Sequence, residues 1–232
     1  MTQSDNSAAQ DPTAYTAHLP ILKEAGAALV GLGLLDIAAL AYCIRYNIAY
    51  TSSFNIFAVI AGLLLLGGSL RTASVVRWFS VFMLSSVAIA LPLSPLVQPL
   101  GLTLVQVRNA PVDSLFLAVF YAAICALWAW LAVALGKPEV HAARAATGRR
   151  RRDMRIPGGL GAGLALLAIV GLSVVLNGES AEKAKTLAQE QAGPDYRYSV
   201  RALNFTNHSV AALVTAWNDR EVRQIPVTWT KP

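Results

Sequence analysis

GRRRRDMRIPGGLGAG, residues 148–163, is the stretch that decides how this chain is organised. Four consecutive arginines end one block of apolar segments, and a further apolar segment begins at Gly158. A basic cluster beside a membrane span stays on the cytoplasmic side. The cluster therefore predicts the direction of every other span, and its side chains are expected to face lipid headgroups. It consists of Arg149, Arg150, Arg151, Arg152 and Arg155.

The composition is typical of a membrane protein. Of the 232 residues, 55% are hydrophobic and 14% are charged, whereas a soluble domain is about 25% charged. The formal net charge is +6, but residues 137–157 alone hold seven basic and two acidic residues. Topology and anionic lipid account for a basic excess beside a span. Membrane lipid is therefore an expected partner, and nucleic acid is not.

Long apolar runs predict a mainly α, polytopic transmembrane bundle with five spans. Residues 1–18 predict a disordered cytoplasmic tail, and residues 19–136 hold the first four spans. Arg71–Arg77 predicts a short cytoplasmic loop, and residues 98–112 predict a loop at the outer interface, with a strand-like piece as the alternative. The fifth span lies within residues 158–178. The predicted spans cover residues 25–44, 54–70, 78–97, 114–135 and 158–176.

Asp36 is the only ionisable residue deep inside a predicted span. Carboxylates within a membrane are rare and often mark an ion or proton path. Such a path usually needs several polar residues, however. The preferred interpretation is therefore a carboxyl group hydrogen-bonded to a neighbouring helix, through Ser69, Ser85 or Tyr121.

The connector, residues 137–157, is predicted to be cytoplasmic and to form at most a short surface helix in which His141 is solvated. The fifth span begins with Gly159 and Gly163, whose i, i+4 spacing places both on one helix face. Packing of that face against the first four helices is its expected use, and a specific dimer is the alternative.

Residues 179–232 predict a small extramembrane α+β domain with one helix and a three-stranded antiparallel meander. Ala181, Ala184 and Leu187 recur at helical spacing, and Gly193 ends the helix. The strand-like runs lie at residues 196–203, 210–217 and 225–229.

The middle run is apolar on both faces, so the domain is expected to lean on the bundle or on a partner and to present a sheet edge. The candidate partner-binding residues are aromatic, although strands favour aromatics in any case; they are Tyr196, Tyr198, Trp217 and Trp229.

No catalytic, metal or cofactor motif stands out, so no catalytic residue, metal or cofactor is expected. Cys43 and Cys125 lie singly in apolar runs and are interpreted as small buried side chains. The nearest approach to a polar cluster at one interface consists of Gln98, Gln106, Arg108 and Asp113.

These patterns predict a multi-pass protein of a bacterial inner membrane, with a cytoplasmic N-terminus and a periplasmic C-terminal domain. The bacterial assignment rests on few lysines and many Ala, Leu and Arg residues. The leading hypothesis is a non-enzymatic accessory, assembly or scaffold subunit that binds another membrane or periplasmic protein through that domain. The alternatives are a transporter or channel component that uses Asp36, and a membrane enzyme acting on lipid or quinone.

Overall fold

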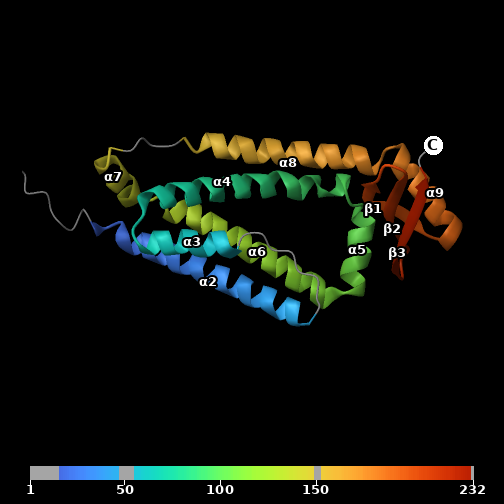
Figure 1. The fold of residues 1–232 in the computed structure, drawn as a ribbon, viewed down its shortest axis with the longest axis horizontal. Helices are drawn as coiled ribbons and strands as arrows, with labels where there is room; N and C mark the ends of the chain where they lie inside the picture. Colours follow the sequence, from blue (N-terminus) through green and yellow to red (C-terminus); the bar gives the residue numbers. More distant parts are fainter. Residues whose placement is uncertain (1–15, 47–54, 149–152, 231–232) are drawn as a thin grey trace, which may run out of the picture. The chain divides into compact units, whose positions relative to one another are not determined.

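The computed structural model describes residues 16–46, 55–148 and 153–230, so Arg149 to Arg152 of the basic cluster lie outside the described residues. The described chain is mostly helical and ends in a small sheet (Figure 1). In chain order the elements are α2 (Leu19–Arg45), α3 (Asn55–Leu66), α4 (Leu70–Leu93), η1 (Ser94–Leu96), α5 (Leu100–Asn109), α6 (Pro111–Ala134), α7 (Pro138–Ala146), α8 (Arg155–Leu176), α9 (Glu179–Ala192), β1 (Arg197–Phe205), β2 (Ser209–Trp217) and β3 (Val222–Thr230).

Among the described residues, four helices are long and apolar enough to cross a membrane, which indicates a multi-pass membrane protein. They are α2, α4 with η1, α6 and α8. In each of them, at most 17% of the most apolar stretch is buried inside the described chain. Large side chains such as Leu35, Phe116 and Leu167 are exposed. Lipid is the medium that covers so much apolar surface without a cost.

The predicted second span, residues 54–70, is represented by α3, which has only 12 residues. At 1.5 Å per residue α3 is about 18 Å long, whereas the hydrocarbon core of a bilayer is about 30 Å thick. The helix ends early because Gly68 has a φ of +79°, a conformation that favours glycine. Among the described residues, four of the five predicted spans correspond to helices long enough to cross a membrane, and the second predicted span is not confirmed.

Three further predictions are corrected. Arg71–Arg77 is not a loop but the beginning of α4, and residues 100–109 form helix α5 where a loop or a strand was expected. His141 is not simply solvated, because it contacts Arg77. The predicted short helix in the connector is confirmed as α7.

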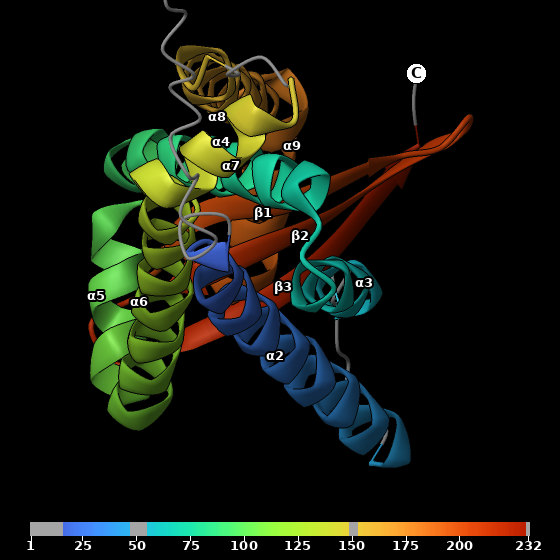
Figure 2. The same cartoon turned by 90° about the vertical axis from the view of Figure 1, so that its left-hand side faces the viewer.

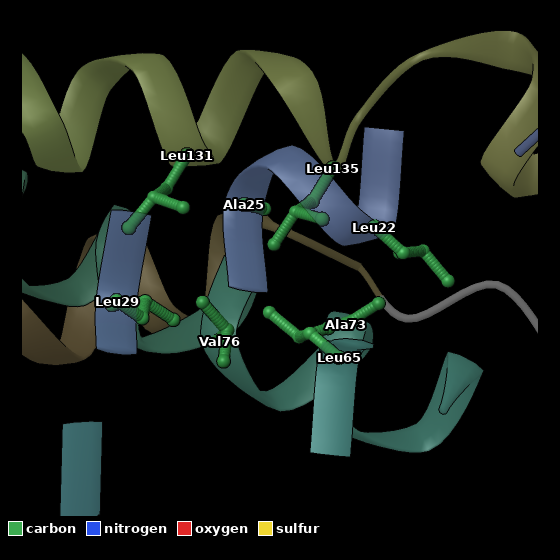
Figure 3. Packing of buried hydrophobic residues seen from close by; sticks show 8 residues of the cluster. All are labelled: Leu22, Ala25, Leu29, Leu65, Ala73, Val76, Leu131 and Leu135. Atoms are coloured by element: carbon green, nitrogen blue, oxygen red, sulfur yellow. The ribbon is translucent and has the colours of Figure 1, made fainter. Parts of the chain in front are cut away.

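The described chain divides into two compact units. The first contains α2, α3, the first part of α4, the end of α6, and α7. Its core is a cluster of buried apolar side chains contributed by α2, α3, α4 and the end of α6 (Figure 3). The cluster consists of Leu22, Ala25, Leu29, Leu65, Ala73, Val76, Leu131 and Leu135.

Helices α2 and α3 approach each other through two glycines. A Cβ atom added at Gly26 would lie 2.7 Å from the carbonyl oxygen of Gly62, and a Cβ atom added at Gly62 would lie 2.7 Å from the carbonyl oxygen of Gly26. Both distances are far inside van der Waals contact. The two backbones thus touch at a point where only glycine fits, as small residues allow in membrane helices.

We expect Gly26→Ala to destabilise the protein by roughly 1–3 kcal/mol, because the added methyl group forces the two backbones apart. Gly31→Ala on the same helix is the matched control, since a Cβ atom there meets no atom within 4 Å. Melting temperatures of the purified variants in one detergent test this. A Gly26→Ala variant as stable as Gly31→Ala would contradict the close contact.

The C-terminal end of α6 is capped by a side chain from α4. The last four carbonyl groups of a helix have no partner within the helix. Those of Leu131, Val133 and Ala134 accept hydrogen bonds from the backbone amides of residues 135–137. The remaining carbonyl, that of Ala132, accepts a hydrogen bond of 3.3 Å from Nε of Arg77. The positive guanidinium also lies at the negative end of the helix dipole.

The same guanidinium also contacts helix α7 through a hydrogen bond to His141. Nη1 of Arg77 lies 2.8 Å from Nε2 of His141. Arginine has only donors, so Nε2 of His141 is the acceptor and the imidazole is the neutral tautomer with its proton on Nδ1. A Cβ atom at Gly136 would lie 2.8 Å from Nη2 of Arg77 and 2.9 Å from the carbonyl oxygen of Ala132. Gly136 therefore leaves the space that this contact needs.

We expect Arg77→Met to cost about 1–3 kcal/mol of stability, because the Ala132 carbonyl and the His141 imidazole both lose their donor. The exposed Arg71, two turns earlier on α4, gives the matched control Arg71→Met. Unfolding of both variants in detergent, followed by circular dichroism, measures the difference. Equal melting temperatures of Arg77→Met and Arg71→Met would show that Arg77 does not cap α6.

The second unit contains the later part of α4, the first part of α6, η1, α5, nearly all of α8, α9 and the sheet. The strands are neighbours in the order β1-β2-β3, and both pairs are antiparallel (Figure 2). The predicted meander is thereby confirmed. Helix α9 ends before Gly193, which has a φ of +90°.

Candidate functional site

Helix α9 covers one face of the sheet. Its alanines Ala181, Ala184 and Ala188 are fully buried against the apolar side chains of the three strands. Small side chains let the helix lie close to the sheet. The strand residues of this cluster are Val200, Ala212, Val214 and Val227.

Residues from α5 meet the opposite face. A Cβ atom at Gly101 would lie 3.8 Å from Nη1 of Arg197 and 3.9 Å from Nε1 of Trp217. At the end of α5, Nδ2 of Asn109 donates a hydrogen bond to the carbonyl oxygen of Arg220. Helix α5 thus meets the opposite face at one end, near Arg197 and Trp217, whereas Asn204 and Thr228 on the same face are exposed.

Between α5 and the sheet lies a cavity of about 230 Å³, which we call the hollow. Its walls combine apolar side chains of α5 with charged side chains and one indole. The lining residues are Gly101, Leu104, Val105, Arg108, Arg197, Trp217 and Asp219.

The hollow contains three charged residues. Within the part of the chain that the structure describes, Arg108, Arg197 and Asp219 take part in no ion pair. All three residues are exposed, whereas Trp217 is only 5% exposed. The hollow thus contains two arginines without an ion pair, beside the buried indole of Trp217. Nε1 of this indole lies close to Gly101.

The solvent side of α5 is apolar. Leu100, Leu104 and Val107 are exposed and recur at i, i+4 and i+7, so they form one stripe along the helix. We call these three residues the apolar stripe. Leu104 belongs both to the stripe and to the hollow.

Strand β1 is one edge of the sheet. Its register with β2 shifts between Val200 and Ala202, so Arg201 forms a bulge. Beyond the bulge, Ala202–Phe205 is uncharged and largely exposed. On the other edge, Pro226 of β3 is paired with Leu213 of β2.

The four aromatic residues predicted for partner binding do not share one face. Tyr198 and Trp229 pack beside the α9 cluster, and Trp217 lines the hollow on the opposite face. The hydroxyl of Tyr198 donates to the carbonyl oxygen of Gly193, and Nζ of Lys183 lies 5.8 Å from the centre of the Trp229 ring. Burial, followed by the charge of Asp195, raises the pKa of Tyr198.

Tyr196 belongs to a small polar cluster that joins the start of β1 to the β2–β3 turn. Its hydroxyl donates to Glu221, which also accepts a hydrogen bond of 3.0 Å from Arg223. The bond from Tyr196, followed by that from Arg223, lowers the pKa of Glu221. The same bond to Glu221, followed by burial, raises the pKa of Tyr196.

We expect Tyr196→Phe to raise the pKa of Glu221 towards its ordinary value, because the largest cause of the lowering is removed. Since the folded-state pKa is depressed, the contribution of Glu221 to stability is present above the unfolded-state value of about 4.3 and is lost as the pH falls further. NMR titration of the glutamate carboxyl groups measures the shift. Tyr198→Phe is the control and should leave Glu221 unchanged.

The remaining predicted residues lie apart. Asp36 is half-buried on α2, and the two cysteines are free and half-buried. At Gly159 and Gly163 an added Cβ atom would meet no atom within 4 Å in the described chain. Helix α8 contacts α4 through a hydrogen bond of 3.1 Å from the Ser86 hydroxyl to the Gly161 carbonyl.

The predicted polar set is divided. Gln98 donates from Nε2 to Oε1 of Gln106 over 3.0 Å, whereas Arg108 lines the hollow and Asp113 is in the first turn of α6. Gly101 was not among the predicted residues, because residues 98–112 suggested a loop. The helical spacing of the apolar stripe was the signal that would have shown a helix there.

Among the described residues, no three His, Cys, Asp or Glu side chains are placed to hold a metal ion. No known protein family, curated protein or solved structure matches this chain.

Proposed function

We propose that this protein is a non-enzymatic accessory, assembly or scaffold subunit of a bacterial inner membrane, and that it binds a partner protein through the edge of its C-terminal sheet. The observation that carries this proposal is the arrangement of the sheet. Helix α9 covers one face, α5 meets one end of the other, and β1 and β3 are the edges at which a strand of another chain can pair. A strand added at an edge gains main-chain hydrogen bonds with little change in the domain.

The outer part of β1 is the better of the two edges. Ala202–Phe205 carries no charge, and Phe205 is 50% exposed. The bulge at Arg201 confines pairing to this short segment, which limits unspecific association. On β3, Pro226 lacks an amide donor, and Arg223 is occupied by Glu221.

The basic residues of the first unit support a cytoplasmic N-terminus. The hydrogen bonds of Arg77 bring the start of α4, the end of α6 and α7 together. Across this end of the unit, basic residues exceed acidic ones, as expected on the cytoplasmic side. The basic residues there are Lys23, Arg71, Arg77, Lys137 and Arg144, and the acidic ones are Glu24 and Glu139.

The same end supports a fifth crossing. Gly68, just after α3, lies against Leu19 at the start of α2. Between Tyr46 and Leu66 the chain has therefore returned to the side on which α2 begins. Together with α2, α4, α6 and α8, this return supports the proposal of five crossings and of a periplasmic C-terminal domain.

Asn204, Ala211 and Thr228 form one row across the three strands, and this row provides a sharp test. Asn204→Lys puts a charge on the β1 edge and should abolish binding of the partner. Thr228→Lys puts the same charge on the β3 edge and should leave binding intact. Both residues are exposed, so both variants should melt as the unaltered protein does.

The partner is trapped by a photo-crosslinking amino acid placed at residue 204 or 228 in living cells. We expect a crosslinked protein from position 204 that is absent from position 228 and that no longer co-purifies with Asn204→Lys. Retention of every partner by Asn204→Lys would refute the proposal. Deletion of residues 194–232 is a poorer test, because it also uncovers α5 and α9.

A further inference from the structure

We propose that the hollow between α5 and the sheet binds the phosphodiester headgroup of an anionic phospholipid, whose acyl chains lie along the apolar stripe of α5. The site is separate from the β1 edge proposed for the partner protein, because it uses residues of α5 and of the opposite end of β1.

The donors of the hollow suit a phosphate group. Nη1 of Arg197 and Nε1 of Trp217 both lie within 4 Å of the point where Gly101 lacks a side chain. Arg108 lines the same cavity. Guanidinium groups bind phosphate oxygens through paired N–H donors, and an indole N–H can only donate. Two donor groups therefore lie beside the space left open by a glycine, and a third donor residue lines the same cavity.

The charge of the lining selects a diester. Two arginines and one aspartate, Asp219, give the hollow a formal charge of +1. A phosphodiester carries one negative charge and balances it, whereas a phosphate monoester carries nearly two at neutral pH. The Asp219 carboxylate would repel the second charge. It also leaves an acceptor for a headgroup hydroxyl.

The surroundings favour a lipid over a soluble anion. Helix α5 ends at Asn109, and the membrane-capable α6 begins at Pro111. The first turns of α6 expose Val112, Leu115 and Phe116, and the apolar stripe exposes Leu104 beside the hollow. The charged cavity thus adjoins apolar surface at the end of a span, which is where phospholipid headgroups lie.

Gly101 allows a direct test on the full-length protein in detergent. Gly101→Leu fills the hollow, whereas Gly101→Ala is the matched control, because its Cβ atom makes only ordinary contacts of 3.8 and 3.9 Å. Native mass spectrometry and thermal shift with added phosphatidylglycerol measure binding. We expect Gly101→Ala to bind as the unaltered protein does and Gly101→Leu to bind about tenfold or more weakly.

Arg108→Gln is a second variant that tests the same site even if Gly101→Leu fails to fold. Arg108 is exposed, so its loss should weaken phosphatidylglycerol binding without lowering the melting temperature. Arg220→Gln, an exposed arginine outside the lining, is its control and should bind normally.

Glycerol 3-phosphate and inorganic phosphate are tested as competitors, and neither should displace the lipid at millimolar concentration. Displacement by either would overturn the lipid assignment in favour of a soluble anion. Undiminished phosphatidylglycerol binding by Arg108→Gln, or by a folded Gly101→Leu, would overturn the site itself.

Discussion

The hydrogen bond from Arg77 to the carbonyl oxygen of Ala132 is the interaction on which the first unit depends. Near a membrane, carbonyl groups at a helix end that lack hydrogen-bond donors raise the free energy of the folded protein. The last carbonyl groups of α6 therefore need donors. The amides that follow the helix supply three of them, and Arg77 supplies the fourth. Because the same guanidinium reaches His141, one side chain from α4 closes α6 and fixes α7.

The sheet also depends on contacts with helices. Fifty-odd residues make a marginal domain by themselves, and an apolar middle strand needs cover on both sides. Helix α9 provides it on one face, and α5 contacts one end of the other face, although α5 lies about ninety residues earlier in the chain. The α+β domain is consequently not independent of the helices that precede it. The two surfaces that we propose for binding are the β1 edge and the hollow beside α5.

The sequence predicted what depends on local pattern and missed what depends on distant contacts. The length of the apolar runs predicted the four long helices, and the alternation of apolar and polar residues predicted the strands. The end of α3 was missed because no charged residue occurs between the start of α3 and Arg71, whereas Gly68 ends the helix through its backbone conformation. Helix α5 was missed because Gln106 and Arg108 looked like loop residues. No local pattern could connect Arg77 with His141, which lies 64 residues away.

We propose that the basic connector and the sheet lie on opposite sides of the membrane. Single cysteines at the exposed Ala145 and Glu190, in a chain without Cys43 and Cys125, measure this most directly. In intact cells a membrane-impermeant thiol reagent should label Glu190→Cys and leave Ala145→Cys unlabelled until the cells are broken. Labelling of Ala145→Cys alone, or of both sites equally, would contradict the account.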